Sequence, residues 1–408
     1  MGDRPDVLVL GAGAAGLAAA ASAARRGAAV TVVERLPAAG KKLLATGGGR
    51  CNLLNDRLSP SAFTSTDPAL VASILERFGR DEIRAFFQGL GLRLQSDEAG
   101  RVYPATNQAA SVLKVLELET ARRGVRIETR FEAKTITGPG GRFRVESADG
   151  RSMESQALIL AAGGRSYPAL GSNGSGFDLA AAIGHTIIAP VPSAVPLLVK
   201  DRMCHFLQGQ RLRVRIESRV AGRTRQKAEG ELLFAQYGLS GTAALDVSES
   251  LSIALNREGR EDAAVVVDFL PFMAEKDAAE ELGRRVASGW TTKDLVSGLL
   301  PEKFSLIMPQ LFREAGRAPD PGDPAGTGRR LAALLKRREF PVLGTRGWNE
   351  AEFTSGGVDA REVKTGTLES KLKKGLYLAG EILDVQGGRG GFNLAWAWAS
   401  GFVAGQLG

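Results

Sequence analysis

The sequence contains few residues of the kinds that form disulfide frameworks and metal clusters. Its 408 residues include two cysteines, Cys51 and Cys204, and two histidines, His185 and His205. The cysteines lie far apart and in no C-x-x-C or zinc-type spacing, which excludes a disulfide framework and a redox-active cysteine pair. Two histidines leave too little material for a histidine-rich metal site, so we predict that the chain binds no metal.

Long apolar runs and targeting segments are also missing. No apolar run approaches the ~20 residues that cross a bilayer. Strand-like sequence begins at Asp6, with neither a signal-peptide nor a transit-peptide pattern before it. A hydrophobic fraction of 44% and a charged fraction of 24% are typical of soluble globular proteins. We therefore expect a cytoplasmic protein with no membrane partner.

The charge balance is basic: 53 Lys and Arg against 45 Asp and Glu give a net charge of +8. This balance favours anionic partners such as a nucleotide, an acidic substrate or a nucleic acid. A solvated basic surface accounts for it better, because no Lys/Arg block with interleaved aromatic residues stands out. A nucleic acid is therefore not the partner that we expect.

The chain is too long for one ordinary hydrophobic core, so two or three domains are expected. Pro190, Pro192 and Pro196 mark a change in composition. Extended sequence follows them, then helical sequence, and glycine-rich α/β sequence completes the chain. We predict a cofactor domain built from both ends of the chain, with a β-then-α domain inserted in the middle; the predicted ranges are 1–190 and 341–408 for the former and 191–340 for the latter.

A glycine turn near the N-terminus has the pattern Gly11-x-Gly13-x-x-Gly16. It follows a predicted strand and opens a predicted helix, and a second strand ends at Glu34. In this context the glycines permit a tight turn and let backbone N–H groups approach a pyrophosphate at the start of the helix. The Glu34 carboxylate can accept both ribose hydroxyls and disfavours a 2′-phosphate. The pattern predicts dinucleotide binding and argues against NADP as the ligand of this unit.

A second glycine cluster, Gly47-Gly48-Gly49, is flanked by Thr46 and by Arg50-Cys51-Asn52. Such a backbone-rich loop suits an anion or a flat ring. A flexible surface loop is the alternative, but flexible linkers rarely carry Arg-Cys-Asn directly after their glycines, so we favour a cofactor loop. Cys51 is expected to be a packed thiol rather than a reactive one.

A third signal is a buried strand at 157–160 that ends in the small residues Ala161, Ala162 and Gly163. In flavoproteins a strand of this kind passes beneath the pyrophosphate. A glycine-rich helix start at 171–178 can hold an anion or serve as a structural turn, and the sequence leaves both open. His185 follows the end of that helix and is expected to be a satisfied cap rather than a catalyst.

The fourth signal lies near the C-terminus. A buried strand ends at Gly380-Glu381, Asp384 follows, and a glycine-rich turn at 387–391 opens a helix from about Phe392 to Gln406. A carboxylate at such a strand end can bind a polyol, here the ribitol of a flavin. The positive N-terminal end of the helix can face the flavin edge that becomes negative on reduction. Trp396 and Trp398 on this helix are expected in the core.

Together these motifs resemble the BaiN/RdsA-type bacterial NAD(P)/FAD-dependent oxidoreductases, which include aminoacetone oxidase-like flavoproteins; the matching runs are Gly11–Gly16, Lys42–Asn52, Ala161–Gly176 and Gly380–Leu394. The resemblance covers almost the whole chain. It implies an α/β fold with a Rossmann-like, glutathione reductase-like FAD-binding domain that is discontinuous in sequence. It further implies that the insert consists of a β-barrel at about 191–270 and a helical part at about 271–340.

The resemblance also implies roles for individual residues. Glu34 would hold the adenosine ribose, the loop Thr46–Asn52 would wrap the pyrophosphate and flavin, and Glu381 with Asp384 would lie at the ribitol. Asn393 and Leu394 would meet the pyrimidine edge. The full set of expected FAD contacts is Gly11, Gly13, Ala14, Ala15, Gly16, Glu34, Arg35, Lys42, Thr46, Gly47, Gly49, Arg50, Cys51, Asn52, Ala133, Ala161, Ala162, Gly163, Gly380, Glu381, Asp384, Gly391, Phe392, Asn393 and Leu394.

Two features depart from the pattern of the family. Ala235-Gln236 and Thr242 stand where members commonly have Thr-His and Pro. If that histidine serves the substrate, aminoacetone-like chemistry is in doubt for this chain. Arg389 stands where a small or hydroxyl residue is more usual.

The function predicted from these features is two-electron (hydride) transfer between FAD and a small organic substrate or NAD(P)H, with reoxidation by O₂ or a second substrate. An amine oxidase-like reaction is one form of it. Tyr167, Arg50 and Arg389 are the polar residues expected near the flavin ring. The sequence has no second strand–glycine turn–helix–acid unit, so NAD(P)H is expected as a transient reductant. The alternatives are a nucleic-acid-associated flavoprotein related to tRNA-modifying FAD enzymes, and a non-catalytic flavin-binding sensor; substrate and oligomeric state stay open.

Overall fold

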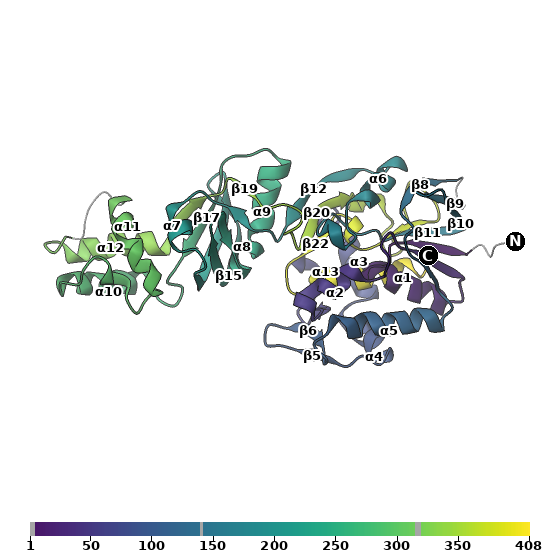
Figure 1. Ribbon diagram of the computed structural model, residues 1–408, viewed down its shortest axis with the longest axis horizontal. Coiled ribbons are helices and arrows are strands. Elements are labelled where there is room, and N and C mark those ends of the chain that lie inside the picture. Colours follow the sequence, from purple (N-terminus) through teal and green to yellow (C-terminus); the bar gives the residue numbers. More distant parts are fainter. Residues whose placement is uncertain (1–4, 139–141, 315–319) are drawn as a thin grey trace. The chain divides into compact units, whose positions relative to one another are not determined.

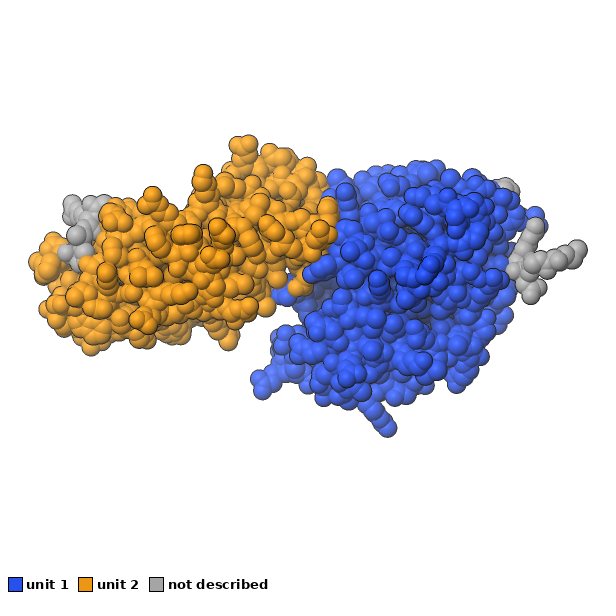
Figure 2. Space-filling view, in the orientation of Figure 1, with its two compact units in different colours: residues 1–190, 353–408 blue, residues 191–352 orange. Residues whose placement is uncertain are grey.

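The computed structural model describes residues 5–138, 142–314 and 320–408. Its contacts divide the chain into two compact units (Figure 2): unit 1 consists of Met1–Pro190 and Phe353–Gly408, and unit 2 of Val191–Glu352. The first boundary falls among the prolines that mark the change in composition. The second falls beyond the predicted residue 340, because the strands at 338–345 belong to the sheet of unit 2.

Unit 1 is built on a parallel sheet of five strands in the order β21-β11-β1-β2-β7. The first strand of the chain is therefore central, and β21 comes from the C-terminal stretch. Short apolar runs are typical of strands buried on both faces, and every residue of β1 and β2 is buried. The bounds are Val7–Leu10 (β1), Val30–Val33 (β2), Arg126–Glu128 (β7), Ala157–Leu160 (β11) and Leu376–Leu378 (β21).

The first and last helices of unit 1 pack against each other, α1 at Ala14–Arg25 and α13 at Phe392–Ala404 (purple and yellow in Figure 1). α1 consists mostly of alanine, so another backbone can come close to it. A Cβ atom on Gly401 would overlap the carbonyl oxygen of Ala15, and one on Gly405 would overlap that of Ala19. Gly401 in α13 and Gly405 directly after it thus allow the C-terminal stretch to pack closely against the N-terminal βαβ unit.

Smaller elements surround this sheet. A three-stranded antiparallel layer has the order β10-β9-β8, a second has the order β3-β6-β5, and β22 pairs with β4 and β12 with β20. The strands are β3 Leu54–Asn55, β4 Phe63–Ser65, β5 Leu94–Ser96, β6 Arg101–Pro104, β8 Ala133–Thr137, β9 Phe143–Ser147, β10 Ser152–Ser155, β12 Ile187–Ser193, β20 Phe353–Val358 and β22 Val385–Gly387. The helices are α2 Lys41–Ala45, η1 Thr46–Gly49, η2 Pro60–Ala62, α3 Pro68–Arg77, α4 Arg80–Gly89, α5 Ala109–Arg122, η3 Pro168–Leu170, α6 Ser175–Ala182, η7 Ala360–Glu362 and η8 Gly380–Ile382.

Unit 2 contains a seven-stranded antiparallel sheet in the order β18-β17-β14-β15-β16-β13-β19. Its two outer strands follow each other in the chain, and the residues between them continue the pairing: the Val342 amide donates to Ala263 O and the Leu343 amide to Leu198 O. The sheet therefore closes on itself as a small barrel. The strands are β13 Leu197–Leu198, β14 Arg211–Val220, β15 Arg223–Ala235, β16 Gly238–Ser240, β17 Ala263–Asp268, β18 Arg338–Pro341 and β19 Gly344–Thr345.

The helices of unit 2 include a long pair, α10 and α12, that packs face to face. Their bounds and those of the shorter helices are α7 Arg202–Phe206, α8 Thr242–Asp246, α9 Ser248–Ser252, η4 Ile253–Arg257, α10 Glu275–Ala287, η5 Asp294–Val296, η6 Glu302–Leu306, α11 Met308–Glu314 and α12 Pro324–Lys336. Among the described residues, no helix has the length and apolar character that a bilayer crossing requires. The same residues contain no group of three or more Cys, His, Asp or Glu arranged to hold a metal ion.

Candidate cofactor and active site

The three glycines of the first turn differ in what surrounds them. A Cβ on Gly11, whose φ is 105°, would lie 2.5 Å from Ala161 O, and one on Gly16 would overlap Gly11 O. A Cβ on Gly13 would meet nothing within 4 Å. The φ angle of Gly13 is −83°, a value that any residue can adopt. Neither packing nor conformation explains this glycine. Open space at the first turn of α1 fits the close approach of a pyrophosphate to backbone N–H groups.

Glu34 lies at the end of β2 and is held in a fixed orientation by that turn. Its carboxylate accepts hydrogen bonds from the Ala12 and Leu36 amides, each 2.9 Å long, and the residue is buried. The next side chain, Arg35, donates to Gly171 O at 3.2 Å. An acid fixed beside the glycine turn has the placement expected of a group that binds ribose hydroxyls.

The loop Thr46–Asn52 is sharply turned and anchored at Cys51. Gly47, Gly48 and Gly49 have positive φ values of 59°, 65° and 86°, and Cys51 has one of 59°. The Cys51 amide donates to Thr46 O at 2.9 Å and its side chain is fully buried. Burial raises the pKa of the Cys51 thiol to about 12, against the opposing effect of a hydrogen bond with the Thr46 side chain. Cys51 is therefore a packed, neutral thiol.

This loop adjoins the start of α13. A Cβ on Gly391, the residue before the helix, would overlap Leu54 O and would lie 2.8 Å from Asn52 Oδ1. Asn52 Oδ1 is buried and accepts no hydrogen bond from any described residue. A buried acceptor without a donor is costly unless a ligand supplies one. An N–H group on the pyrimidine edge of a flavin would satisfy it.

Three side chains and one backbone amide from distant segments meet beside this loop. Lys42 Nζ donates to Ser166 Oγ and to Glu381 Oε2, both at 2.7 Å. Glu381 Oε1 accepts from the Thr354 amide at 2.8 Å and from Ser166 Oγ at 3.2 Å. Burial acts to raise the pKa of Glu381, but the Lys42 ammonium and these hydrogen bonds outweigh it and hold that pKa below its usual value. Glu381 is thus a carboxylate at neutral pH.

The third motif adjoins the first and the fourth. The Ala161 amide donates to Leu10 O, and a Cβ on Gly164 would lie 2.9 Å from the Glu381 carboxyl carbon. Tyr167 follows, half-buried, with φ 52° and ψ 64°. A bulky residue in the left-handed region is strained, and such strain clusters at functional sites.

Several other predicted contacts have structural partners of their own. Asn393 accepts from the Gly387 amide and donates to Gly387 O, at 2.9 and 2.8 Å, so it braces the turn before α13. Asp384 is buried and accepts from Gln386 Nε2 at 2.7 Å. Phe392 packs edge-on against Phe63. The small residues Ala14, Ala15, Ala133, Ala162, Gly163 and Gly380, together with Leu394 and Arg389, are half-buried or buried in the same unit.

The sequence contained no signal for two residues of this site. Thr354 on β20 accepts from the Arg165 amide at 2.8 Å and from the Ser166 amide at 3.3 Å, and so joins the third motif to Glu381. Tyr103 on β6 lies under the glycine loop, where the Arg50 guanidinium stands 5.0 Å from its ring centroid. Both are single residues in otherwise ordinary strands. The predicted satisfied role of His185 is confirmed: it is buried and bonds Glu362 and Ser370, each at 2.9 Å.

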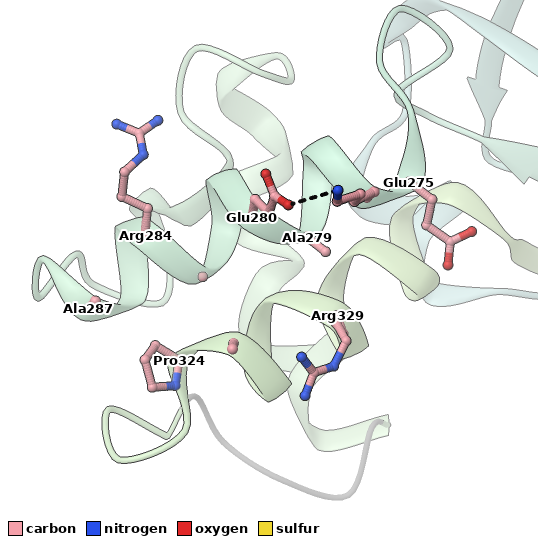
Figure 3. A pocket seen from close by; sticks show the side chains of 10 residues that line it. Glu275, Ala279, Glu280, Arg284, Ala287, Pro324 and Arg329 are labelled. Atoms are coloured by element: carbon pink, nitrogen blue, oxygen red, sulfur yellow. Dashed lines mark ion pairs between the residues drawn. The ribbon is translucent and has the colours of Figure 1, made fainter.

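A separate hollow of about 800 Å³ lies in unit 2 between α10 and α12. Figure 3 shows Arg284, Glu280 and Arg329 around it. None of the residues that line it belongs to the predicted cofactor or catalytic set.

The parallel sheet, the glycine turn with its carboxylate, and the C-terminal strand and helix that complete the unit define an FAD-binding Rossmann-like α/β flavoprotein. Comparison with known families agrees: residues 5–407 match the model of the HI0933-like protein Rossmann domain. The chain belongs to this family.

Two relatives match over nearly the full length of both chains. The 3-dehydro-bile acid delta(4,6)-reductase of Clostridium scindens is 36% identical over 98% of this chain and 97% of its own. The ribosomal RNA dihydrouridine synthase of Haemophilus influenzae is 30% identical over 99% and 98%. Among solved structures, a 3-ketosteroid-delta4-(5alpha)-dehydrogenase from Rhodococcus jostii has a TM-score of 0.51 at 17% identity, covering 99% of this chain and 97% of that one. A flavocytochrome c3 fumarate reductase has a TM-score of 0.51 at 16% identity, covering 100% and 78%. These two structures support the fold alone.

Proposed function

We propose that this FAD-dependent oxidoreductase reduces a carbon–carbon double bond conjugated to a carbonyl group. The observation that carries the proposal is the chemistry shared by the names of the two relatives. A 3-dehydro-bile acid with double bonds at positions 4 and 6 is a conjugated ketone, and dihydrouridine arises from uridine by saturation of a double bond conjugated to a ring carbonyl. One reaction type covers both substrates, although they differ greatly in size.

The reaction adds a hydride to the β-carbon and a proton to the α-carbon, while NAD(P)H is oxidised to NAD(P)⁺. Bound FAD would accept the hydride of NAD(P)H and pass it on to the substrate. The chain must therefore hold the cofactor, place the β-carbon, exclude water and deliver one proton. The first turn of α1 with Gly13 would hold the pyrophosphate, and Glu34 the ribose. Asn52 and the N-terminal end of α13 would hold the pyrimidine edge, where the helix dipole favours the negative charge of the reduced ring.

We assign proton delivery to the Tyr167 hydroxyl. A phenol is a competent general acid. Tyr167 has a left-handed backbone conformation and directly follows Ser166, which contacts Lys42 and Glu381. Lys42 and Glu381 neutralise each other at 2.7 Å and would form the polar wall beside the ribitol. Arg50 and Arg389 would orient the substrate.

Anaerobic stopped-flow spectroscopy tests this function. The purified flavoprotein is reduced with NADPH or NADH and mixed with a 3-oxo-Δ4-steroid or with uridine-containing ribosomal RNA fragments. We expect the absorbance of oxidised flavin to return with one of these acceptors, and to return roughly 10²-fold more slowly in Tyr167→Phe at unchanged FAD content. Reoxidation by O₂ together with failure of every unsaturated carbonyl compound would overturn the proposal.

The ribosomal RNA relative makes an RNA substrate the second candidate. The net charge of +8 permits it. An RNA substrate requires binding that weakens steeply with salt, so retention of a ribosomal RNA fragment at low but not high ionic strength would favour it. Amine oxidation and flavin sensing are further alternatives. Bleaching of oxidised flavin by amines would support amine oxidation, and a flavin that no donor reduces would support a sensor.

A further inference from the structure

Three of the expected FAD contacts are basic residues, Arg35, Lys42 and Arg50, and they differ in whether a nearby carboxylate compensates their positive charge. Arg35 donates to Gly171 O. Lys42 is paired with the Glu381 carboxylate. Arg50, although exposed, has no carboxylate of any described residue within ion-pair distance. It donates through Nε to Gly47 O at 3.3 Å. The positive charge of Arg50 is thus uncompensated within the part of the chain that the structure describes.

Arg50 is nevertheless held in place. The chain turns through three left-handed glycines before it, and the buried Cys51 after it is hydrogen-bonded back to Thr46 O. The guanidinium stands 5.0 Å from the centroid of the Tyr103 ring, and Tyr103 is 6% exposed on β6. An aromatic ring attracts a guanidinium on its face and reduces the freedom that the side chain has to lose on binding a ligand.

The space beside Arg50 is open. A Cβ on Gly48 or on Gly49 would meet nothing within 4 Å. Two residues after Arg50 comes Asn52, whose buried Oδ1 accepts no hydrogen bond from a described residue and adjoins Gly391 at the start of α13. With FAD bound as the proposed function requires, this loop would lie at the flavin end of the site and the open space at Gly13 at the pyrophosphate end.

We propose that Arg50 binds an anionic group of the substrate, a carboxylate or a phosphate, and so selects anionic conjugated carbonyl compounds. The inference rests on the proposed function, whose substrate class it narrows. The planar fork of the Nη donors matches two oxygens of a carboxylate or phosphate at once, and these donors bond to no described residue. Tyr103 is the positioning residue, because its ring fixes the orientation of the Arg50 guanidinium group.

The test compares each charged ligand with its neutral partner. The pairs are a 3-oxo-Δ4-steroid carboxylic acid with its methyl ester, and uridine 5′-monophosphate with uridine. Dissociation constants are measured by isothermal titration into the oxidised holoprotein, which requires no turnover. For at least one pair we expect the charged member to bind roughly tenfold to a hundredfold more tightly, and the pair that shows this identifies the source of the anion.

Variants of both residues then locate the anion site. Arg50→Gln is expected to bring the charged-to-neutral ratio close to one, and Arg50→Lys to retain part of it because a lysine keeps the charge without the fork. Tyr103→Leu is expected to lower the ratio, and Tyr103→Phe to keep it since the aromatic face remains. Ratios that are equal in wild type and Arg50→Gln would overturn the inference.

Two further outcomes distinguish this inference from a role of Arg50 in FAD binding and from the proposed function itself. If Arg50→Gln loses FAD on purification and regains the wild-type ratio when FAD is restored, the anion held by Arg50 is that of the cofactor, and the inference is wrong. If both members of each pair bind with the expected ratio but neither is reduced by the reduced flavoprotein, the proposed function fails while the anion site stands.

Discussion

Gly13 in the first turn of unit 1 and the glycines at the α10–α12 contact of unit 2 differ in their surroundings, and the difference separates a glycine that packing requires from one that it does not. In unit 2, a Cβ atom on Gly283 would lie 3.0 Å from Pro324 O, and a Cβ atom on Gly328 would overlap Ala279 O. The neighbouring helix thus requires Gly328 and leaves little room for a side chain at Gly283. In unit 1, Gly11 and Gly16 are required by neighbours in the same way, but Gly13 between them faces open space in a conformation that any residue can adopt. Open space alone does not indicate a ligand, since Gly89 and Gly347 also meet nothing within 4 Å. Gly13 differs from them because it is the N-cap residue of the helix that follows the first buried strand, where a pyrophosphate can approach the backbone.

Alanine substitutions at these glycines should give the largest changes in stability. They should separate glycines that folding requires from the glycine that FAD binding requires. Gly16→Ala and Gly328→Ala each place a methyl group on a carbonyl oxygen, so each should lower the free energy of unfolding by about 3 kcal/mol, the upper end for overpacking. Gly13→Ala should leave folding unchanged but weaken FAD binding by roughly tenfold or more, about 1.4 kcal/mol. Urea unfolding and FAD titration measure these quantities.

Gly328→Ala serves as the control for the other two variants. Its lesion lies in unit 2, so whatever FAD content it retains shows what loss of packing alone does. If Gly13→Ala binds FAD as well as wild type does, the pyrophosphate does not approach that turn, and the comparison between required and open glycines loses its meaning.

Each unit carries one buried cysteine, so the two thiols can report on the two units separately. Burial raises the pKa of Cys51 and of Cys204 to about 12, and neither should react with a thiol reagent at pH 8 in the folded protein. In increasing urea, FAD at a hundredfold excess over its dissociation constant should stabilise the structure around Cys51 by about 2.7 kcal/mol. Labelling followed by mass spectrometry gives the urea concentration at which each cysteine begins to react. FAD should raise this concentration less for Cys204 than for Cys51, whereas equal increases would mean that the two units unfold together.

The sequence was informative wherever the chemistry restricts the residue type along a short stretch. The first βαβ unit, the packed thiol at Cys51 and the core positions of Trp396 and Trp398 were all predicted, and the indole N–H groups of the tryptophans donate to Gly380 O and Leu53 O. Each prediction used a pattern within one continuous stretch of sequence, such as a glycine turn or an apolar period, the longest of them running from the first strand to Glu34.

The remaining features depend on contacts between distant segments, which leave no local pattern. Thr354 reaches Ser166 and Glu381 across 188 and 27 residues of sequence, and a threonine in a strand is ordinary in itself. Closure of the barrel by residues 338–345 could not be inferred from the sequence either. Its two strands, Arg338–Pro341 and Gly344–Thr345, are so short that their sequence cannot be distinguished from that of a loop.

The pair formed by Lys42 and Glu381 should show an intermediate effect that depends on pH. The pKa of Glu381 is lowered, so its contribution to stability is present above the ordinary glutamate pKa of about 4.3 and is lost as the pH falls through the lowered value. Lys42→Met should therefore cost about 2 kcal/mol at pH 7, and this difference from wild type should shrink below pH 4. Urea unfolding of FAD-depleted protein measures it, with Lys41→Met at the exposed neighbouring position as control. A cost that is the same at all pH values would assign the effect to lost packing.

The smallest effect is expected on the outer face of unit 2, where Glu229 on β15 pairs with Arg213 and Arg215 on β14 at 2.9 and 3.0 Å. These two arginines and Glu229 are all exposed, and water and salt screen such pairs. Glu229→Gln should leave the urea midpoint and the FAD content indistinguishable from wild type. The contrast with Lys42→Met tests why ion pairs matter in unit 1: both variants remove one partner of a bonded pair, but Lys42 and Glu381 are largely shielded from solvent. A clear loss of stability in Glu229→Gln would show that the sheet of unit 2 depends on its surface ion pairs. Exposed ion pairs in unit 2 would then contribute to stability as the shielded pair in unit 1 does.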